Sequence, residues 1–134
     1  MAKANFEKLR VYELAETLAD AVWELVRPWD SFSRDTVGKQ LVRAADSIGA
    51  NIAEGSGRGT YRDNRQFVRT ARGSLYETKH FLRRAYRRKL VTSTQIKLLK
   101  SALDELGPKL NAYLRYLNDS VTGSTNRRSV PEDN

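Results

Sequence analysis

The sequence contains no cysteine and a single histidine, His80. Without cysteine the chain can form no disulfide, thiolate nucleophile or cysteine-based zinc site. One imidazole also leaves little material for metal binding or for acid–base catalysis. We therefore expect a protein that is not an enzyme and that carries neither a metal ion nor another cofactor.

Long apolar runs are also missing from the chain. No stretch approaches the roughly 20 apolar residues that a membrane-spanning helix needs, and residues 1–10 lack the apolar core of a signal peptide. We expect a cytoplasmic protein without membrane contact. Its 134 residues, 40% of them hydrophobic, suit one domain with one core.

Only three prolines and eight glycines interrupt four segments whose apolar residues recur every three or four positions, the period of a helix. Short connections between helices of similar length favour antiparallel neighbours. The sequence thus predicts an all-α, antiparallel, up-down-up-down four-helix bundle over residues 1–118. We expect its helices at about 6–29, 34–55, 61–89 and 93–118. Residues 119–134 are polar and aperiodic, which predicts a disordered tail.

Helix-capping signals precede three of these segments. The expected N-caps are Ser33, Thr60 and Thr92. Thr92 is followed three positions later by Gln95, the spacing of a capping box. In the last helix a Gly-Pro pair interrupts the apolar row, so we expect a kink near Asp104.

The first segment has two adjacent apolar rows, a wider surface than one core-facing stripe requires. Its two tryptophans, Trp23 and Trp29, are expected in the core or in a subunit interface. Its remaining side carries four carboxylates, here called the acidic row: Glu13, Glu16, Asp20 and Glu24. In the third segment the expected inner face is Phe67, Ala71, Ser74, Leu75, Thr78, Leu82 and Ala85.

The net charge of +8 is concentrated in residues 61–89, which hold ten Lys and Arg against two acidic residues. Seven of these cations fall on one helical face opposite the inner row, with Tyr76 where a basic residue is missing. This basic stripe consists of Arg62, Arg65, Arg69, Arg72, Lys79, Arg83 and Arg87. Guanidinium groups bind phosphate oxygens well, so the stripe is suited to an RNA or DNA backbone. The alternatives are a solvated helix face, or ion pairs with the acidic row of another helix or subunit.

A row of small and polar residues runs beside the apolar face of the second segment. Its polar members are Gln40, Ser47, Asn51, Glu54 and Arg58. They can form a hydrogen-bonded network that fixes helix register, or a subunit contact. A catalytic role for Glu54 would need a second carboxylate or a histidine nearby, and the sequence offers no obvious one.

The stretch from Gln40 to Arg58, QLVRAADSIGANIAEGSGR, carries a resemblance to a known family, and the later Phe67, Ala71, Gly73-Ser74-Leu75 and Glu77 fit the same pattern. It resembles the signature of the bacterial "four helix bundle protein" group, also known as the proteins encoded in intervening sequences of 23S ribosomal RNA genes. The resemblance covers about residues 6–118. It implies an antiparallel protomer that assembles into a ring, commonly a pentamer.

That group is also similar to the accessory variability determinant proteins of diversity-generating retroelements, which are basic, ring-forming bundles that bind nucleic acid and a reverse transcriptase. The first hypothesis is therefore a homo-oligomeric RNA- or DNA-binding accessory protein with a reverse transcriptase as possible partner. The second is a homo-oligomeric protein-interaction scaffold whose arginines form ion pairs between subunits. A hydrolase using Glu54 is the third.

Overall fold

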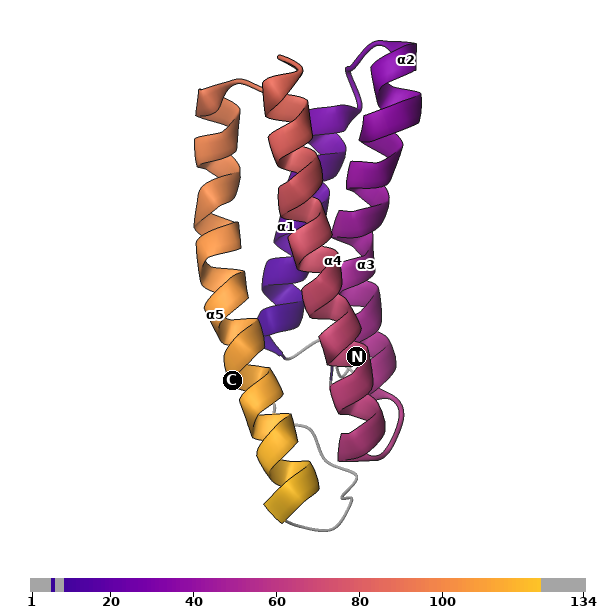
Figure 1. Ribbon diagram of the computed structural model, residues 1–134, viewed down its shortest axis with the longest axis vertical. Helices are drawn as coiled ribbons and strands as arrows, with labels where there is room; N and C mark the ends of the chain where they lie inside the picture. Colours follow the sequence, from indigo (N-terminus) through magenta and orange to yellow (C-terminus); the bar gives the residue numbers. More distant parts are fainter. Residues whose placement is uncertain (1–5, 7–8, 124–134) are drawn as a thin grey trace, which may run out of the picture.

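The computed structural model describes Phe6 and residues 9–123, and this part of the chain is all helical, without a strand (Figure 1). The elements in order are α1 (Arg10–Val26), the single turn α2 (Ser31–Ser33), the π-helical turn η2 (Arg34–Gly38), α3 (Lys39–Ser56), α4 (Tyr61–Arg87) and α5 (Ser93–Gly123). Four long helices thus make up the fold, which confirms the predicted helical bundle.

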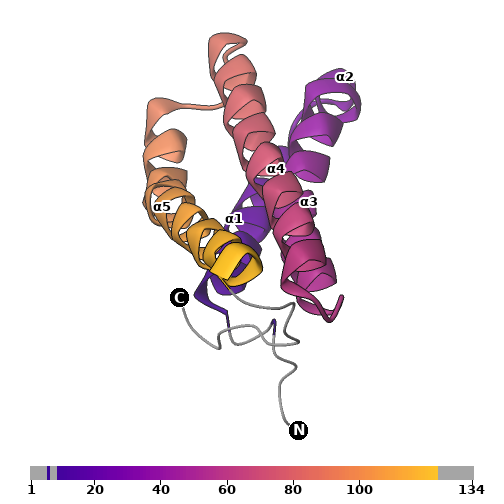
Figure 2. The same ribbon diagram turned by 60° about the horizontal axis from the view of Figure 1, so that its bottom comes forward.

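The long helices surround one apolar core. α3 packs against α1 and α4, while α5 packs against α4 and α1, and the views of Figures 1 and 2 show the chain reversing direction at each connection. Apolar side chains at helical spacing on all four helices turn inward, and their removal from water is the main force holding the bundle together. The largest fully buried residues include Leu18, Leu41, Ile48, Leu75, Leu106, Leu110, Tyr113 and Leu117.

Two of the three predicted N-caps are confirmed. The Thr60 hydroxyl accepts a hydrogen bond from the backbone N–H of Asp63 (3.2 Å). Thr92 and Gln95 form the complete reciprocal capping box, with distances of 2.9 and 3.1 Å. Each pairing satisfies N–H groups that a helix end would otherwise leave without partners.

The prediction of Ser33 as an N-cap is wrong, because the helix begins one turn earlier. The Asp30 carboxylate accepts from the backbone N–H and the hydroxyl of Ser33 (3.0 and 2.8 Å), and these bonds lower the pKa of Asp30. The π-helical turn then leads into α3. It buries Val37 and brings Gly38 against α1, where a Cβ at position 38 would lie only 2.7 Å from Cγ1 of Val26.

The outer ends of the first and last helices also differ from the prediction. α1 spans only Arg10–Val26, with a turn at Pro28 in which the Trp29 N–H donates to the carbonyl of Val26 (2.9 Å). α5 continues through Pro108 with a curved course and reaches Gly123 (Figure 1). Residues 119–123 are therefore helical rather than part of a disordered tail, because Val121 still packs against the core. Residues 124–134 lie outside the described part.

The contact between α3 and α4 is close because small and polar side chains line it. Gly55 lies against Asn64 so tightly that a Cβ there would be 2.5 Å from Oδ1 of Asn64. Nδ2 of Asn64 donates to the hydroxyl oxygen of the buried Tyr113 (3.1 Å) on α5. The buried Asn64 amide of α4 therefore contacts α3 at Gly55 and also bonds to α5.

The predicted inner face of α4 is confirmed at six of its seven positions and wrong at Phe67. The Phe67 ring is only partly buried and lies under the Arg58 guanidinium, whose central carbon is 4.7 Å from the ring centroid. Val68 and Asn64 are buried in its place, although the Phe67 Cβ also lies close to Gly55, only 3.0 Å from where a Cβ at position 55 would be.

None of the helices in the described residues is both long and apolar enough to span a membrane.

Candidate nucleic-acid interface

The basic stripe follows α4 along the side that borders α5. The helix has 27 residues and is therefore about 40 Å long. Five of the seven cations are exposed, whereas Arg65 and Arg72 are partly buried. None of the seven forms an ion pair with a carboxylate of the described residues. The stripe is thus a row of uncompensated positive charge.

The first half of the stripe is held by amide side chains of α5. Nη1 of Arg65 and Nη2 of Arg69 both donate to Oδ1 of Asn118, at 3.3 and 3.5 Å. Nη1 of Arg72 donates to Oδ1 of Asn111 (3.5 Å). Amide oxygens orient guanidinium groups without neutralising them, so each arginine keeps its charge and further donors for an anion.

The second half of the stripe has a different setting. Lys79, Arg83 and Arg87 are exposed, and the Lys79 ammonium lies 5.8 Å from the ring centroid of Tyr76. Beside them, between α4 and α5, is a pocket of about 430 Å³ whose walls include Leu82, Tyr86, Ile96, Lys97 and Leu103. Sequence reasoning missed this pocket. The only trace of it in the sequence is Tyr86, an aromatic residue next to Arg87, the last cation of the stripe.

The acidic row does not compensate the stripe within the chain. It lies on α1, and α4 packs against α3 and α5 instead. Glu13 already pairs with Arg10 of α1 (3.7 Å), and Glu24 pairs with Arg27, the residue that follows α1 (3.0 Å). The interpretation of intrachain ion pairing is therefore wrong for the described residues, whereas pairing between subunits stays a prediction.

The predicted polar row divides into three parts. Ser47 and Asn51 form a network with Ser74 of α4: the two serine hydroxyls are 2.8 Å apart, and the Asn51 amide donates to Ser47. Gln40 is exposed and takes no part in it. Glu54 pairs with Arg58 at 3.7 Å on the surface. No three His, Cys, Asp or Glu side chains of the described residues gather into a possible metal site.

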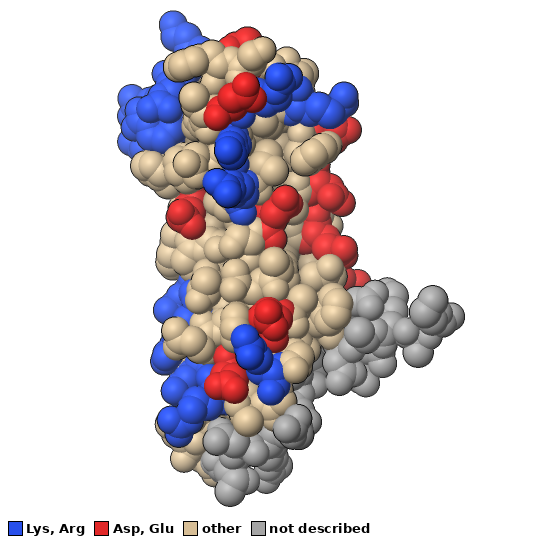
Figure 3. All heavy atoms as spheres, turned by 90° about the vertical axis from the view of Figure 1, so that its right-hand side faces the viewer, with Lys and Arg blue, Asp and Glu red and all other residues tan. Residues whose placement is uncertain are grey.

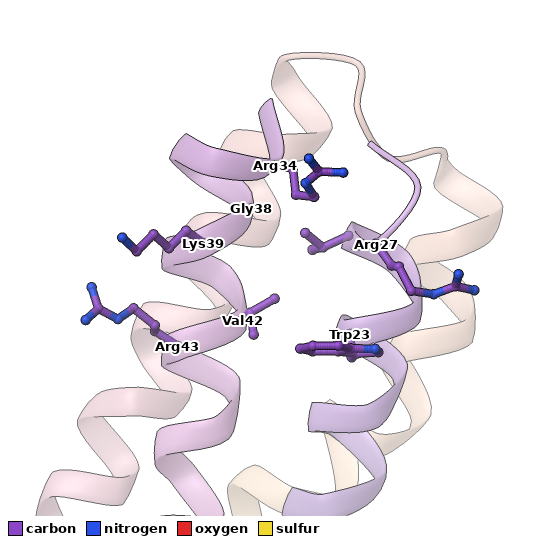
Figure 4. A pocket seen from close by; sticks show the side chains of 8 residues that line it. Trp23, Arg27, Arg34, Gly38, Lys39, Val42 and Arg43 are labelled. Carbon is purple, nitrogen blue, oxygen red and sulfur yellow. The ribbon is translucent and has the colours of Figure 1, made fainter. Parts of the chain in front are cut away.

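The two tryptophans have different environments. Trp29 is partly buried against the core, close to Gly38. Trp23 is 56% exposed and lines an apolar pocket of about 270 Å³ between α1 and α3. Figure 4 shows the Trp23 indole facing Val42 across this pocket. The charged ends of Arg27, Lys39 and Arg43 point away from the floor on both sides.

A second pocket, of about 360 Å³, continues the same groove toward the start of α1. Its lining residues share helix faces with those of the first pocket, since they recur every three or four positions on α1 and α3. Three carboxylates line it: Glu16, Asp20 and Asp46. Desolvation raises the pKa of Asp46, and so does the nearby charge of Asp20. The α1–α3 groove, defined by these two pockets, is therefore cationic at one end and anionic toward the other.

Figure 3 views the α3 side of the bundle and shows the charges on it. Lys and Arg gather near the upper end and again at the lower left, and a column of acidic side chains follows the right-hand edge down to about the middle. Much of the surface between them carries no charge.

Comparison with known proteins finds a similar solved structure and a matching family. A crystal structure of a protein with unknown function from the S23 ribosomal protein family of Bacteroides thetaiotaomicron is similar, with a TM-score of 0.70 and 22% sequence identity. The match covers 78% of this chain and 98% of that one. No curated protein matches the chain. The model of the 23S rRNA-intervening sequence protein family matches residues 7–112, which is most of the sequence. The chain belongs to the family of 23S rRNA-intervening sequence proteins.

Proposed function

We propose that this protein is a non-enzymatic, nucleic-acid-binding accessory protein that holds the phosphate backbone of RNA or DNA against the basic stripe. The observation that carries the proposal is a row of seven cations on one face of α4 without a carboxylate partner in the described residues. Residues 61–89 hold a net charge equal to that of the whole chain, and a basic stripe along one helix is the electrostatic footprint of a surface that binds a nucleic-acid backbone.

The chemistry of this contact is electrostatic. Arginine presents a planar fork of N–H donors that fits two phosphate oxygens, and the amides of Asn111 and Asn118 orient three of these forks. Binding releases the counterions condensed on the nucleic acid, so affinity should fall steeply as salt rises. Phosphate contacts carry no sequence information, so we expect binding of many sequences.

The first test measures binding of the purified protein to labelled RNA and DNA across a salt series, with the mass of each sample from light scattering. The triple variant Arg65→Glu/Arg69→Glu/Arg72→Glu should lose most of the affinity at unchanged mass. Because each lost phosphate contact lowers the slope of log affinity against log salt by about 1, the slope should fall by about 3.

A matched control reverses three cations of the same region outside the stripe: Arg84→Glu, Arg88→Glu and Lys89→Glu. It has the same net charge as the stripe variant and should keep most of the affinity. Equal losses in both variants would show that total charge rather than the stripe drives binding. A stripe variant of reduced mass would instead favour the scaffold function, with the arginines in ion pairs between subunits.

We also propose that the protein is a homo-oligomer and that the α1–α3 groove meets a second copy of the chain. The cationic end around Trp23 and the anionic part around Asp20 are complementary, so the two ends of one groove suit the opposite ends of another. A cation from a neighbour would also relieve the repulsion between Asp46 and Asp20. The apolar floor of the first pocket would add buried area.

A charge-swap experiment tests this contact. The variant Lys39→Glu/Arg43→Glu should have a lower mass in solution than the wild type, because the two new glutamates cancel the charge of Arg27 and Arg34 at the cationic end. Adding Glu16→Lys/Asp20→Lys to the same chain should restore the mass, since the new lysines can pair with the new glutamates of a neighbour. A single mass for all three proteins would contradict a role of the groove in assembly. The same measurement gives the number of subunits. A groove paired with the groove of a second copy closes a twofold dimer, so the ring of five that the family resemblance implies would need an additional head-to-tail contact.

In this role the protein would assist an enzyme that acts on the bound nucleic acid. The resemblance to accessory variability determinant proteins implies that this enzyme is a reverse transcriptase. Co-purification with a reverse transcriptase encoded nearby would support that finer assignment.

A further inference from the structure

We propose that the pocket between α4 and α5 beside Tyr86 receives an unpaired nucleobase, so that the protein prefers single-stranded to double-stranded nucleic acid. This inference rests on the proposed function, because it assigns a substrate class to the same surface. It adds a contact to the base, whereas the stripe alone contacts phosphates.

The pocket has the size and the lining that a base requires. Its volume is about 430 Å³, within the range of small-molecule sites. Leu82 and Leu103 form apolar walls, from α4 and α5 respectively, and Ile96 adds to the α5 side. Tyr86 lines the same pocket and is 48% exposed, so part of its ring is free for stacking. Stacking of a base on an aromatic side chain is worth about 1–3 kcal/mol and tolerates any base.

Cations lie on both helices that form the pocket. Lys79 and Arg83 belong to the basic stripe on α4, and Lys97 belongs to α5. None of the three forms an ion pair within the described residues. A nucleotide whose base enters the pocket would therefore have its phosphates among positive charges on either side. An apolar pocket with surrounding cations fits a flat, uncharged ring on an anionic backbone.

The strand preference follows from where bases lie in each kind of nucleic acid. In a duplex the bases are paired and stacked inside the helix, and reaching the pocket would require extrusion at a cost of a few kcal/mol. In a single strand the bases can be splayed outward while the backbone follows the stripe. The pocket thus contributes to binding only where bases are unpaired.

Three labelled DNA probes of about 15 nucleotides test the proposal, a length within the usual site size of single-strand binding surfaces. The first is a thymidine single strand, the second is the same strand with every base replaced by an abasic site, and the third is a duplex. We expect the intact strand to bind about tenfold more tightly than the abasic strand, which keeps every phosphate. This comparison needs no protein variant.

The variant Tyr86→Ala should lower affinity for the intact strand to that for the abasic strand, and leave binding of the abasic strand and the duplex unchanged. Tyr86→Phe keeps the ring and should retain the preference. The matched control is Phe32→Ala, which removes an exposed aromatic ring on α2 that belongs neither to the stripe nor to the pocket.

The outcomes separate this inference from the proposed function. If the wild type binds the intact strand, the abasic strand and the duplex equally, the pocket takes no base and the inference fails while phosphate binding stands. Equal losses with Phe32→Ala and Tyr86→Ala would also overturn it, because the effect would not belong to the pocket. A protein that binds no probe at low salt removes the proposed function and this inference with it.

Discussion

The two faces of α4 are built from different side chains although they belong to one helix. The inner face has Ala71, Ser74 and Thr78, all buried, and approaches α3 so closely that Gly55 has no room for a Cβ. The outer face has long cationic side chains whose described partners are amide groups of α5 and, for Lys79, the ring of Tyr76. Stability should therefore depend on the inner face and anion binding on the outer one, and substitutions can test whether these properties separate.

The largest expected effect on stability comes from Gly55→Ala. The new Cβ would lie 2.5 Å from Oδ1 of Asn64 and 3.1 Å from its backbone oxygen, and Asn64 is buried and cannot move freely. We expect the free energy of unfolding to fall by about 2 kcal/mol, measured by urea denaturation. Unchanged stability would mean that the inner face is looser than this contact indicates.

A smaller loss is expected from Tyr113→Phe, which removes the hydroxyl that accepts from Nδ2 of Asn64. Oδ1 of Asn64 already has no hydrogen-bond partner among the described residues, so both polar atoms of this buried amide would then be unsatisfied. The expected cost is about 1–2 kcal/mol in the same denaturation experiment. Nucleic-acid affinity of the folded variant should not change. A loss of affinity at unchanged stability would show that the inner and outer faces of α4 do not act separately.

On the outer face, Gly73→Ala should raise stability by about 0.5–1 kcal/mol. Position 73 is exposed within α4, a Cβ there would meet no atom within 4 Å, and alanine has the higher helix propensity. This variant is the matched counterpart of Gly55→Ala. The same substitution should lower the free energy of unfolding where the glycine packs against α4 and raise it where the glycine is exposed. Thermal unfolding of both proteins checks the pair.

The smallest expected effect concerns a surface cation that does have a carboxylate partner. Nε and Nη2 of Arg10 donate to the two carboxylate oxygens of Glu105 (3.0 Å each), and this hydrogen bonding lowers the pKa of Glu105. A carboxyl whose folded pKa is depressed adds stability above its unfolded pKa, and this contribution is lost as pH falls through the folded pKa. Unfolding measured between about pH 6 and 3 should show a slightly weaker acid dependence in Glu105→Gln. Arg69→Gln, which removes a cation without a carboxylate partner, should leave that dependence unchanged.

The sequence was sufficient to predict the features that depend on local chemistry. The capping box at Thr92, the N-cap at Thr60 and the inner positions of α4 follow from spacing and side-chain type, and the structure has them. The bundle of four long helices follows from the apolar periodicity in the same way. The matched family also agrees with the resemblance carried by residues 40–58.

The features that the sequence did not predict depend on contacts between distant segments. A carboxylate at Asp30 and a π-helical turn set the start of the second long helix, and no periodicity reveals such a turn. Phe67 fits an apolar row, but its ring lies against the Arg58 guanidinium, which follows α3, while Asn64 and Val68 are the buried residues. The pocket at Tyr86 requires α5 to lie beside α4 with Ile96 opposite, which no linear pattern specifies.

The tight packing of Gly55 on Asn64 also affects how relatives of this protein should be interpreted. Residues 40–58, on which the family resemblance was based, include most of α3 and supply its side of the contact with α4. Recognition through this segment therefore detects a shared way of packing two helices. The outer face of α4 does not take part in this contact with α3, so its arginines can be replaced without disturbing the packing of the two helices. Membership of the family and the function of the outer face are therefore separate questions. Grouping relatives by the charge of α4 would address the second one.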